Sequence, residues 1–124
     1  MLPTISKSSS ETGRPPLDRA ALERLALHYV GRYQTSRSRL VAYLRRTLDR
    51  RGWSGDDIPP IEAIVERMAA LGYVDDRAFA EARAKGLQRR GYGARRQAAA
   101  LGAAGIGADQ IGAAIDALDA DPFE

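Results

Sequence analysis

The chain has 124 residues, 44% of them hydrophobic and 6% aromatic, with no cysteine and a formal net charge of +3. This length allows one small domain or two very small ones, and the lack of cysteine excludes a disulfide framework and a thiolate metal site. Because no apolar run is long enough for a signal peptide or a membrane span, we expect a cytoplasmic protein.

The first half of the chain predicts three helices after a leader, residues 1–17, that we expect to be disordered. Asp18 is placed to cap the first helix, and Thr35 or Ser36 to cap the second, which Gly52 ends. The expected apolar face of the first helix is Leu22, Leu25, Ala26, Tyr29, Val30 and Tyr33. That of the second is Leu40, Val41, Leu44 and Leu48, and that of the third is Ile61, Ile64, Val65, Met68 and Leu71.

A hinge near the middle of the chain organises both halves. Gly72 suits the left-handed position after a helix C-terminus, where a side chain would clash. Asp75 or Asp76 can then cap the next helix. Tyr73 and Val74 lie between these signals, and we expect them to fill the corner.

Three more helices are expected after the hinge. The fourth covers 75–90, the turn Gly91-Tyr92-Gly93 follows, the fifth covers 94–104, and Asp109 caps the sixth. Their expected inward residues are Phe79, Ala82, Gly86 and Leu87 in the fourth, Ala98 and Leu101 in the fifth, and Ile111, Ile115 and Leu118 in the sixth. No segment alternates as a strand would, so the chain is predicted to be all-α.

The two halves align as repeats of one unit. Ser36 falls over Gly93 at the same offset that places Leu44 over Leu101, although the second helix is about one turn longer than the fifth. Short three-helix units bury little surface alone, so we expect helix-turn-helix-like units stacked into an elongated, curved array. The predicted divisions are 18–73 for the first repeat, 74–120 for the second, and 121–124 for the start of a missing or truncated third unit.

Charge alternates with this repeat. The net charge is +6 over 32–51, −5 over 56–81, +6 over 83–96 and −5 over 109–124. Each unit therefore has a basic corner between its first two helices and an acidic third helix. A basic stripe of this kind suits phosphate or an acidic protein surface, whereas the alternative is a solvated face paired with the acidic helix.

The candidate partner-binding residues lie in the two basic segments. Arg39, Arg46 and Arg50 fall on one flank of the second helix, with Tyr43 among them. Arg83 and Arg90 are expected near the Phe79 face, which would leave the fourth helix half covered. The full set is Arg37, Arg39, Tyr43, Arg46, Arg50, Arg83, Arg89, Arg90, Arg95 and Arg96.

Catalysis has little support in the sequence. His28 is the only histidine and has no nearby Ser/Asp arrangement, and capping accounts for Asp56-Asp57 and Asp75-Asp76. Neither a phosphate-binding loop nor a metal-ligand cluster is present. We therefore expect a non-enzyme without cofactor or metal.

Two stretches resemble the RecX family of bacterial regulatory proteins, which are built from three-helix repeats. Leu71–Ala80 resembles the family's hinge, and Arg89–Arg96 resembles its Gly-Tyr-Gly turn, with Ala94 in place of the usual proline and Gln97 in place of an aliphatic residue. The hinge and core residues carried over are Gly72, Tyr73, Asp75, Asp76, Phe79, Gly91, Tyr92 and Gly93.

The resemblance implies a monomeric, non-enzymatic regulator that binds the RecA recombinase along the groove of its filament on single-stranded DNA. Such a protein would restrain ATP hydrolysis, strand exchange and the SOS-promoting activity of RecA. Whether DNA is contacted directly stays open. One alternative is an arginine-rich helix-turn-helix module that binds nucleic acid itself, and another is an adaptor for a different partner.

Overall fold

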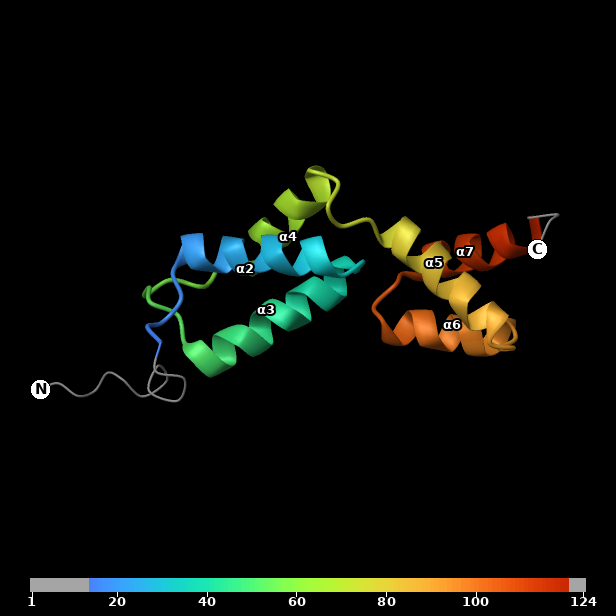
Figure 1. Cartoon of the computed structure of the whole chain (residues 1–124), viewed down its shortest axis with the longest axis horizontal. Helices are drawn as coiled ribbons and strands as arrows, with labels where there is room; N and C mark the ends of the chain where they lie inside the picture. The colour runs from blue at the N-terminus through green and yellow to red at the C-terminus, as the bar shows by residue number, and fades with distance from the viewer. Residues whose placement is uncertain (1–13, 121–124) are drawn as a thin grey trace, which may run out of the picture.

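The computed structural model describes residues 14–120, and all regular elements in that range are helices. In chain order they are α2 (Arg19–Arg32), α3 (Arg37–Arg51), α4 (Ile61–Ala70), α5 (Asp76–Arg89), α6 (Ala94–Ala103) and α7 (Ala108–Ala120), shown in Figure 1. The predicted all-α class is confirmed. Among the described helices, none is long and apolar enough to cross a membrane.

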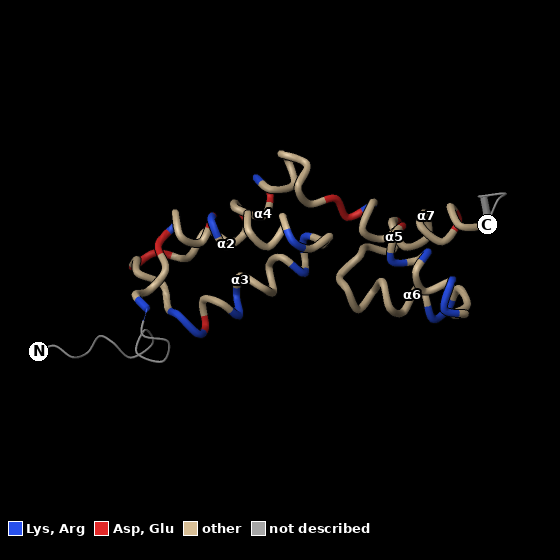
Figure 2. The backbone as a smooth tube through the Cα atoms, in the orientation of Figure 1, with Lys and Arg blue, Asp and Glu red and all other residues tan. Residues whose placement is uncertain are grey.

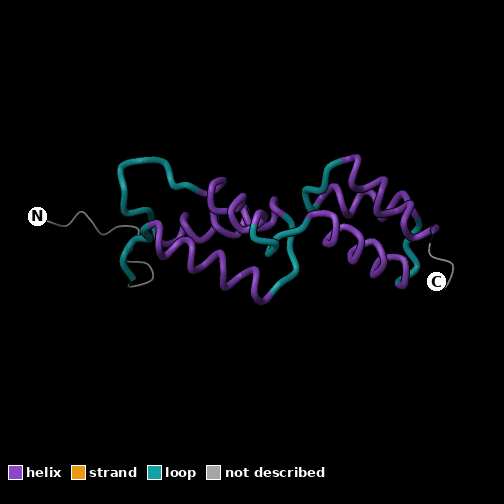
Figure 3. Tube along the Cα trace, turned by 90° about the horizontal axis from the view of Figure 1, so that it is seen from above, coloured by secondary structure: helices purple, strands orange, loops and turns teal. Residues whose placement is uncertain are grey.

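The helices form two groups that follow one another along the long axis of the molecule (Figures 1 and 3). In the first unit, α2, α3 and α4 pack against one another, and in the second unit α5, α6 and α7 do the same. Each unit has its own cluster of buried residues. This layout gives the elongated form expected of a helical repeat.

Capping residues start α2 and α3 as the sequence predicts, whereas α4 follows Pro60 without a side-chain cap. The Asp18 carboxylate accepts a hydrogen bond from Ala21 N at 2.8 Å, and Ser36, rather than Thr35, caps α3. The core of this unit is Leu17, Leu22, Ala26, Leu40, Leu44, Ile61, Ile64, Val65, Met68 and Val74. Two expected core residues are wrong: Tyr33 and Leu71 follow the last turns of their helices and are 52% and 57% exposed.

The expectation that the disordered leader extends to residue 17 is wrong, because Leu17 is part of the folded first unit. Its side chain is only 1% exposed, and its N–H donates to Gly52 O at 2.8 Å while its carbonyl accepts from Ser54 N at 2.9 Å. Trp53, next to that pairing, packs partly buried on the same core. Residues 1–13 lie outside the described range, as do residues 121–124, where a third unit was expected to begin.

The second unit buries smaller side chains. Its core is Phe79, Ala80, Ala84, Leu101, Ala104, Ile106, Ala114 and Leu118. On α5 the expected Phe79 and Leu87 are buried together with Ala80 and Ala84, whereas Gly86 is half-buried and Ala82 is exposed, so the inward stripe lies partly to one side of the predicted one. Arg83 and Arg90 are exposed, but Phe79 is buried, so the half-covered Phe79 face that was expected is not observed.

The start of α7 also differs from the prediction. Asp109 lies within the first turn of this helix, which already begins at Ala108, so it is not the residue that precedes the helix. An acidic side chain in the first turn still faces the positive end of the helix. Along α7, Leu118 is buried, Ile111 and Ile115 are half-buried, and Ala114 is the additional buried residue.

The hinge after α4 takes the expected backbone form. Gly72 has a φ of 87°, and Tyr73 N–H donates back to Met68 O at 2.9 Å, which closes the last turn of the helix. Val74 is buried, whereas the Tyr73 side chain is 51% exposed and does not fill the corner. Tyr73 therefore contributes its backbone to the hinge and leaves its ring on the surface.

Polar contacts join the two units where the N-terminus of α3 meets α5 and the end of α6. Asp75 caps α5 through Ala78 N at 3.0 Å, whereas Asp76 accepts from Arg37 N at 2.8 Å and so caps a helix of the other unit. The hydroxyls of Ser36 and Ser38 donate to Ala104 O and Gly105 O, at 3.2 and 3.3 Å. These bonds satisfy helix termini that would otherwise need water or other partners.

Candidate partner-binding surface

The two positions that the sequence aligned, Ser36 and Gly93, both precede the second helix of a unit. Ser36 is the N-cap residue of α3 and Gly93 that of α6, and the aligned pair Leu44 and Leu101 is fully buried. α3 has 15 residues and α6 has 10, so they match best at their first turns.

This register makes Arg39 and Arg96 equivalent, each at the third position of its helix. Both arginines are exposed and lie near an aromatic ring. The guanidinium carbon of Arg39 is 5.8 Å from the Phe79 ring centroid, and that of Arg96 is 4.2 Å from the Tyr92 centroid. Each unit thus presents one exposed arginine at the third position of its second helix, although the ring beside Arg39 belongs to α5 of the second unit and the ring beside Arg96 to the turn before α6.

The predicted flank of α3 is present and open to solvent. Arg39, Arg46 and Arg50 are exposed, and none of them forms an ion pair with residues 14–120. Tyr43 is half-buried and stacks on Tyr29, with ring centroids 4.2 Å apart. Part of this flank is therefore held by the first unit, while its three guanidinium groups remain available to a partner.

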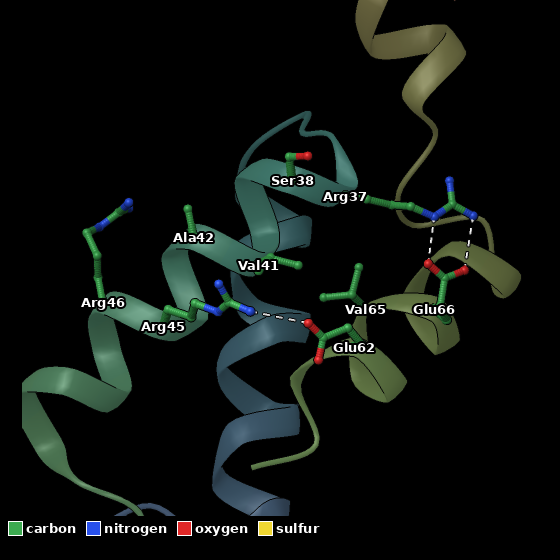
Figure 4. Close-up of a pocket in the computed structure, with 9 residues that line it drawn as sticks. All are labelled: Arg37, Ser38, Val41, Ala42, Arg45, Arg46, Glu62, Val65 and Glu66. Atoms are coloured by element: carbon green, nitrogen blue, oxygen red, sulfur yellow. Dashed lines mark hydrogen bonds and ion pairs between the residues drawn. The ribbon is translucent and has the colours of Figure 1, made fainter. Parts of the chain in front are cut away.

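Arg37 does not belong to this open flank. Its guanidinium donates to both Glu66 carboxylate oxygens, from Nε at 2.9 Å and Nη2 at 3.2 Å, across a groove between α3 and α4 (Figure 4). The hydrogen bond with Glu66 is the main cause that raises the pKa of Arg37, and the same bond lowers the pKa of Glu66. Arg45 pairs with Glu62 at 3.3 Å on the same side.

The groove beside these pairs is floored by Val41, Ala42 and Val65 (Figure 4). In that view Arg45 reaches toward α4, whereas Arg46 points away from it. The alternative of an arginine face paired with the acidic helix therefore holds for this side of α3 only. The two sides of one helix differ in charge because α4 lies against one of them.

The cations of the second unit gather around the α5–α6 turn. Arg83, Arg89, Arg90, Arg95 and Arg96 are all exposed. Arg90 and Arg96 both lie near the half-buried Tyr92 ring, the former at 5.7 Å from its centroid. Figure 2 shows basic positions along α3 and again at the α5–α6 turn, so the structure keeps the two predicted sets apart along the molecule.

The turn itself depends on a buried amide. Gly91 has a φ of 89°, and Tyr92 N–H donates to Leu87 O at 3.0 Å. The Gln97 side chain is buried, and its Nε2 donates to Tyr92 O at 2.7 Å. Gln97 Oε1 has no hydrogen-bond partner among the described residues.

The sequence did not predict one surface cavity. A cavity of about 550 Å³ lies between the end of α2 and the start of α3, lined by His28, Tyr29, Arg32, Tyr33, Gln34, Arg39 and Tyr43. The Tyr29 ring lies beside both Tyr33, at 5.1 Å, and Tyr43, at 4.2 Å between centroids. The available sequence signal was the helical spacing of Tyr29 and Tyr33, which we interpreted as core.

Across residues 14–120, no three His, Asp or Glu side chains come together as ligands for a metal ion. His28, the single histidine, is exposed at the rim of the cavity described above. Asp75 and Asp76 each accept a backbone hydrogen bond, as capping residues do. The geometry of the described residues thus emphasises arginine and tyrosine, which are typical of binding surfaces.

Comparison with known proteins gives a consistent set of relatives. No family model matches the chain. Regulatory protein RecX of Myxococcus xanthus (strain DK1622) is 33% identical over 95 residues, which are 73% of this chain and 51% of the relative. Regulatory protein RecX of Mycobacterium sp. (strain JLS) is 34% identical over 115 residues, 91% of this chain and 61% of the relative.

The proteins of two further Mycobacterium strains, KMS and MCS, match to the same extent and have the same name. The chain spans about half to three fifths of the length of these curated relatives. The similarity covers both helical units, including the hinge and the turn that first indicated the family. The chain therefore belongs to the RecX family of regulatory proteins.

Proposed function

We propose that this chain is a non-enzymatic regulator that binds RecA, on the filament that RecA forms on single-stranded DNA. Binding would restrain ATP hydrolysis, strand exchange and the SOS-promoting activity of RecA. The relatives are named regulatory proteins, which supports the class of function. The RecA partner comes from the family resemblance in the hinge and the Gly-Tyr-Gly turn.

The observation that best supports the proposal is the equivalence of Arg39 and Arg96. A filament presents the same surface at regular intervals, and a repeat protein can meet successive copies with equivalent residues. Here each unit offers an exposed arginine at the third position of its second helix, and each of the two guanidinium groups lies near an aromatic ring. Guanidinium groups in this setting suit carboxylates of a protein surface or phosphates of DNA.

The test is a titration of the single-strand-dependent ATPase of RecA with this chain and its variants. Arg39→Ala and Arg96→Ala should each raise the concentration needed for half inhibition, and the double variant should raise it further. Arg19→Ala is the matched control. It removes the same charge, but from an arginine that already pairs with Glu23 within α2. No inhibition by the unaltered chain in excess would reject the proposed function.

Direct nucleic-acid binding by the arginine-rich α3 is the second candidate. The ion pairs of Arg37 and Arg45 with α4 count against a helix that is basic all round. Binding through the open flank alone would depend strongly on salt, since each neutralised phosphate releases counterions. The aromatic cavity offers a more specific way to contact a nucleic acid.

A further inference from the structure

The cavity between α2 and α3 combines three features that suit a ligand. Three tyrosine rings lie in a row, two arginines stand at the rim, and no carboxylate is among the lining residues. A volume of about 550 Å³ lies within the range of small-molecule sites, about 300–1,000 Å³. The chemistry therefore favours a ligand that is both flat and anionic.

We propose that this cavity binds one nucleotide of a single-stranded nucleic acid, with the base stacked on Tyr33 and the phosphate beside Arg32 and Arg39. Tyr33 is suited to stacking because about half of its surface is exposed and its ring also lies against the Tyr29 ring, with centroids 5.1 Å apart. Every base has a π-face, so such a platform tolerates any sequence. The binding does not depend on RecA and goes beyond the regulatory function proposed above.

The arginines match the phosphate side of this ligand. Arg32 has its guanidinium carbon 5.7 Å from the Tyr33 ring centroid, so cation and stacking surface are adjacent. Neither Arg32 nor Arg39 forms an ion pair with the described residues. The exposed side chains of His28 and Gln34 add hydrogen-bonding groups at the rim for base edges.

The flank of α3 extends the site in one direction. Arg46 and Arg50 follow Arg39 on the same side of the helix, at about 10 Å and then about 6 Å further along its axis. A strand leaving the cavity could therefore pass a series of unpaired cations. This continuation favours a strand over a free nucleotide, and an unstacked base favours a single strand over a duplex.

The groove between α3 and α4 is a natural comparison within the same helix. It also has arginines on its rim, but Glu62 and Glu66 already neutralise Arg45 and Arg37 there. A phosphate approaching that groove would meet carboxylates and no aromatic ring among the lining residues. Arg45 therefore provides a matched control for the arginines of the cavity.

The experiment measures the fluorescence anisotropy of a labelled oligothymidylate of about twelve nucleotides, within the usual site sizes, without RecA. Tyr33→Ala should weaken binding by about 5- to 100-fold, the effect of removing one stacked base. Tyr33→Phe should bind as the unaltered chain does, because stacking needs the ring and not the hydroxyl. Circular dichroism checks that each variant retains its helices, which is expected because the Tyr33 side chain is largely on the surface.

The same assay tests the role of the arginine charges and distinguishes a single strand from a duplex or a free nucleotide. Arg32→Ala should lower the slope of log affinity against log salt by about one, and Arg45→Ala should change it less. A duplex of equal length and free thymidine monophosphate should both bind more weakly than the single strand.

The proposal is overturned if the oligomer does not bind, if Tyr33→Ala binds it unchanged, or if the duplex or the mononucleotide binds as tightly as the strand. It is also overturned if Tyr33→Ala weakens the binding of RecA but leaves the affinity for the oligomer unchanged, since the cavity would then be a protein-binding site. Because none of these readouts uses the ATPase, failure here leaves the regulatory function to its own test.

Discussion

The two helical units have the same layout but are filled differently. Of the ten buried residues of the first core one is alanine, whereas four of the eight in the second core are alanine. Burying alanine removes little apolar area from water, so the second unit gains less hydrophobic stabilisation from the same topology. Caps and turns therefore define the repeat in this chain, whereas the size of the core side chains differs between the two units.

The units also differ in how their cations are held. In the first unit, α4 neutralises two arginines of α3, through Glu62 and Glu66. In the second unit, the described ion pair is Arg77–Glu81 within α5, and the arginines around the α5–α6 turn have none. The smaller unit therefore carries the less neutralised basic surface.

The largest effect is expected from Phe79→Ala. Among the described buried residues of the second core, Phe79 is the one aromatic residue, and removing such a buried ring costs about 3–5 kcal/mol. Because the alanine-rich core has little else to offset that loss, α5 to α7 should unfold before α2 to α4. Hydrogen exchange followed by residue should show early loss of protection in the second unit.

Tyr73→Ala is the control for this experiment, since it removes a ring that is mostly exposed. It should change the free energy of unfolding by less than about 0.5 kcal/mol, as surface substitutions usually do. Equal loss of protection in both units after Phe79→Ala would mean that they fold as one cooperative body.

The next effect concerns the junction and compares two glycines. Gly72 and Gly105 have nearly the same positive φ, 87° and 85°, so alanine strains both by about 1 kcal/mol. A Cβ on Gly72 would meet nothing within 4 Å, whereas one on Gly105 would overlap the Ser38 side chain of the other unit. Gly105→Ala should therefore cost a further 1–3 kcal/mol or so, the usual cost of overpacking.

Chemical denaturation of both variants measures this difference. Ser38→Gly should rescue most of the excess cost of Gly105→Ala and none of the cost of Gly72→Ala. Equal destabilisation by the two alanines would show that the units do not press together at this point.

Local signals made part of this structure predictable. Ser36 and Gly93 could be matched because a cap or a helix-starting turn is written in adjacent residues, and that match placed Arg39 over Arg96. Contacts between distant segments carry no such signal. The bond from Arg37 N to Asp76 depends on how two units meet, which spacing within either helix does not encode.

The errors in the core and the site have the same origin. Leu71 and Tyr33 continue a helical spacing, but their helices end first, so periodicity placed them inward and the structure leaves them on the surface. The same mistake hid the cavity, since Tyr33 was assigned to the core. Leu17 was missed for the opposite reason: a single apolar residue outside a helix has no period to reveal it.

A smaller, favourable effect is expected from Gln97→Leu. Gln97 is buried in the second unit, and its Oε1 has no hydrogen-bond partner among residues 14–120. Burying an unpaired polar atom costs more free energy than burying an apolar group of similar size. The substitution gives up one hydrogen bond to Tyr92 O and fills the site with apolar volume. We expect a net gain of about 1 kcal/mol in the free energy of unfolding, measured by denaturant titration.

A buried polar residue of the first unit provides a contrast. Thr47 is also buried, but its hydroxyl donates to Tyr43 O at 2.9 Å and is satisfied. Thr47→Val should therefore give no comparable gain. If Gln97→Leu destabilises the chain instead, the amide is needed to hold the turn before α6.

The smallest effect is expected at the Arg37–Glu66 pair, and it depends on pH. The hydrogen bond from Arg37 lowers the pKa of Glu66 below its usual value near 4.5, so the ionised carboxylate stabilises the folded first unit. That contribution is fully present above the ordinary pKa and disappears as the pH falls through the lowered one. Since Glu66 is exposed, solvent screens the pair and the contribution is small. Glu66→Gln should therefore melt slightly below the unaltered chain at pH 7, and the difference should close as the pH falls below the usual carboxyl pKa and through the lowered pKa of Glu66. A difference in melting temperature that stays constant over this range would show that the amide disturbs the groove between α3 and α4 by its shape, and that the charge of Glu66 does not contribute.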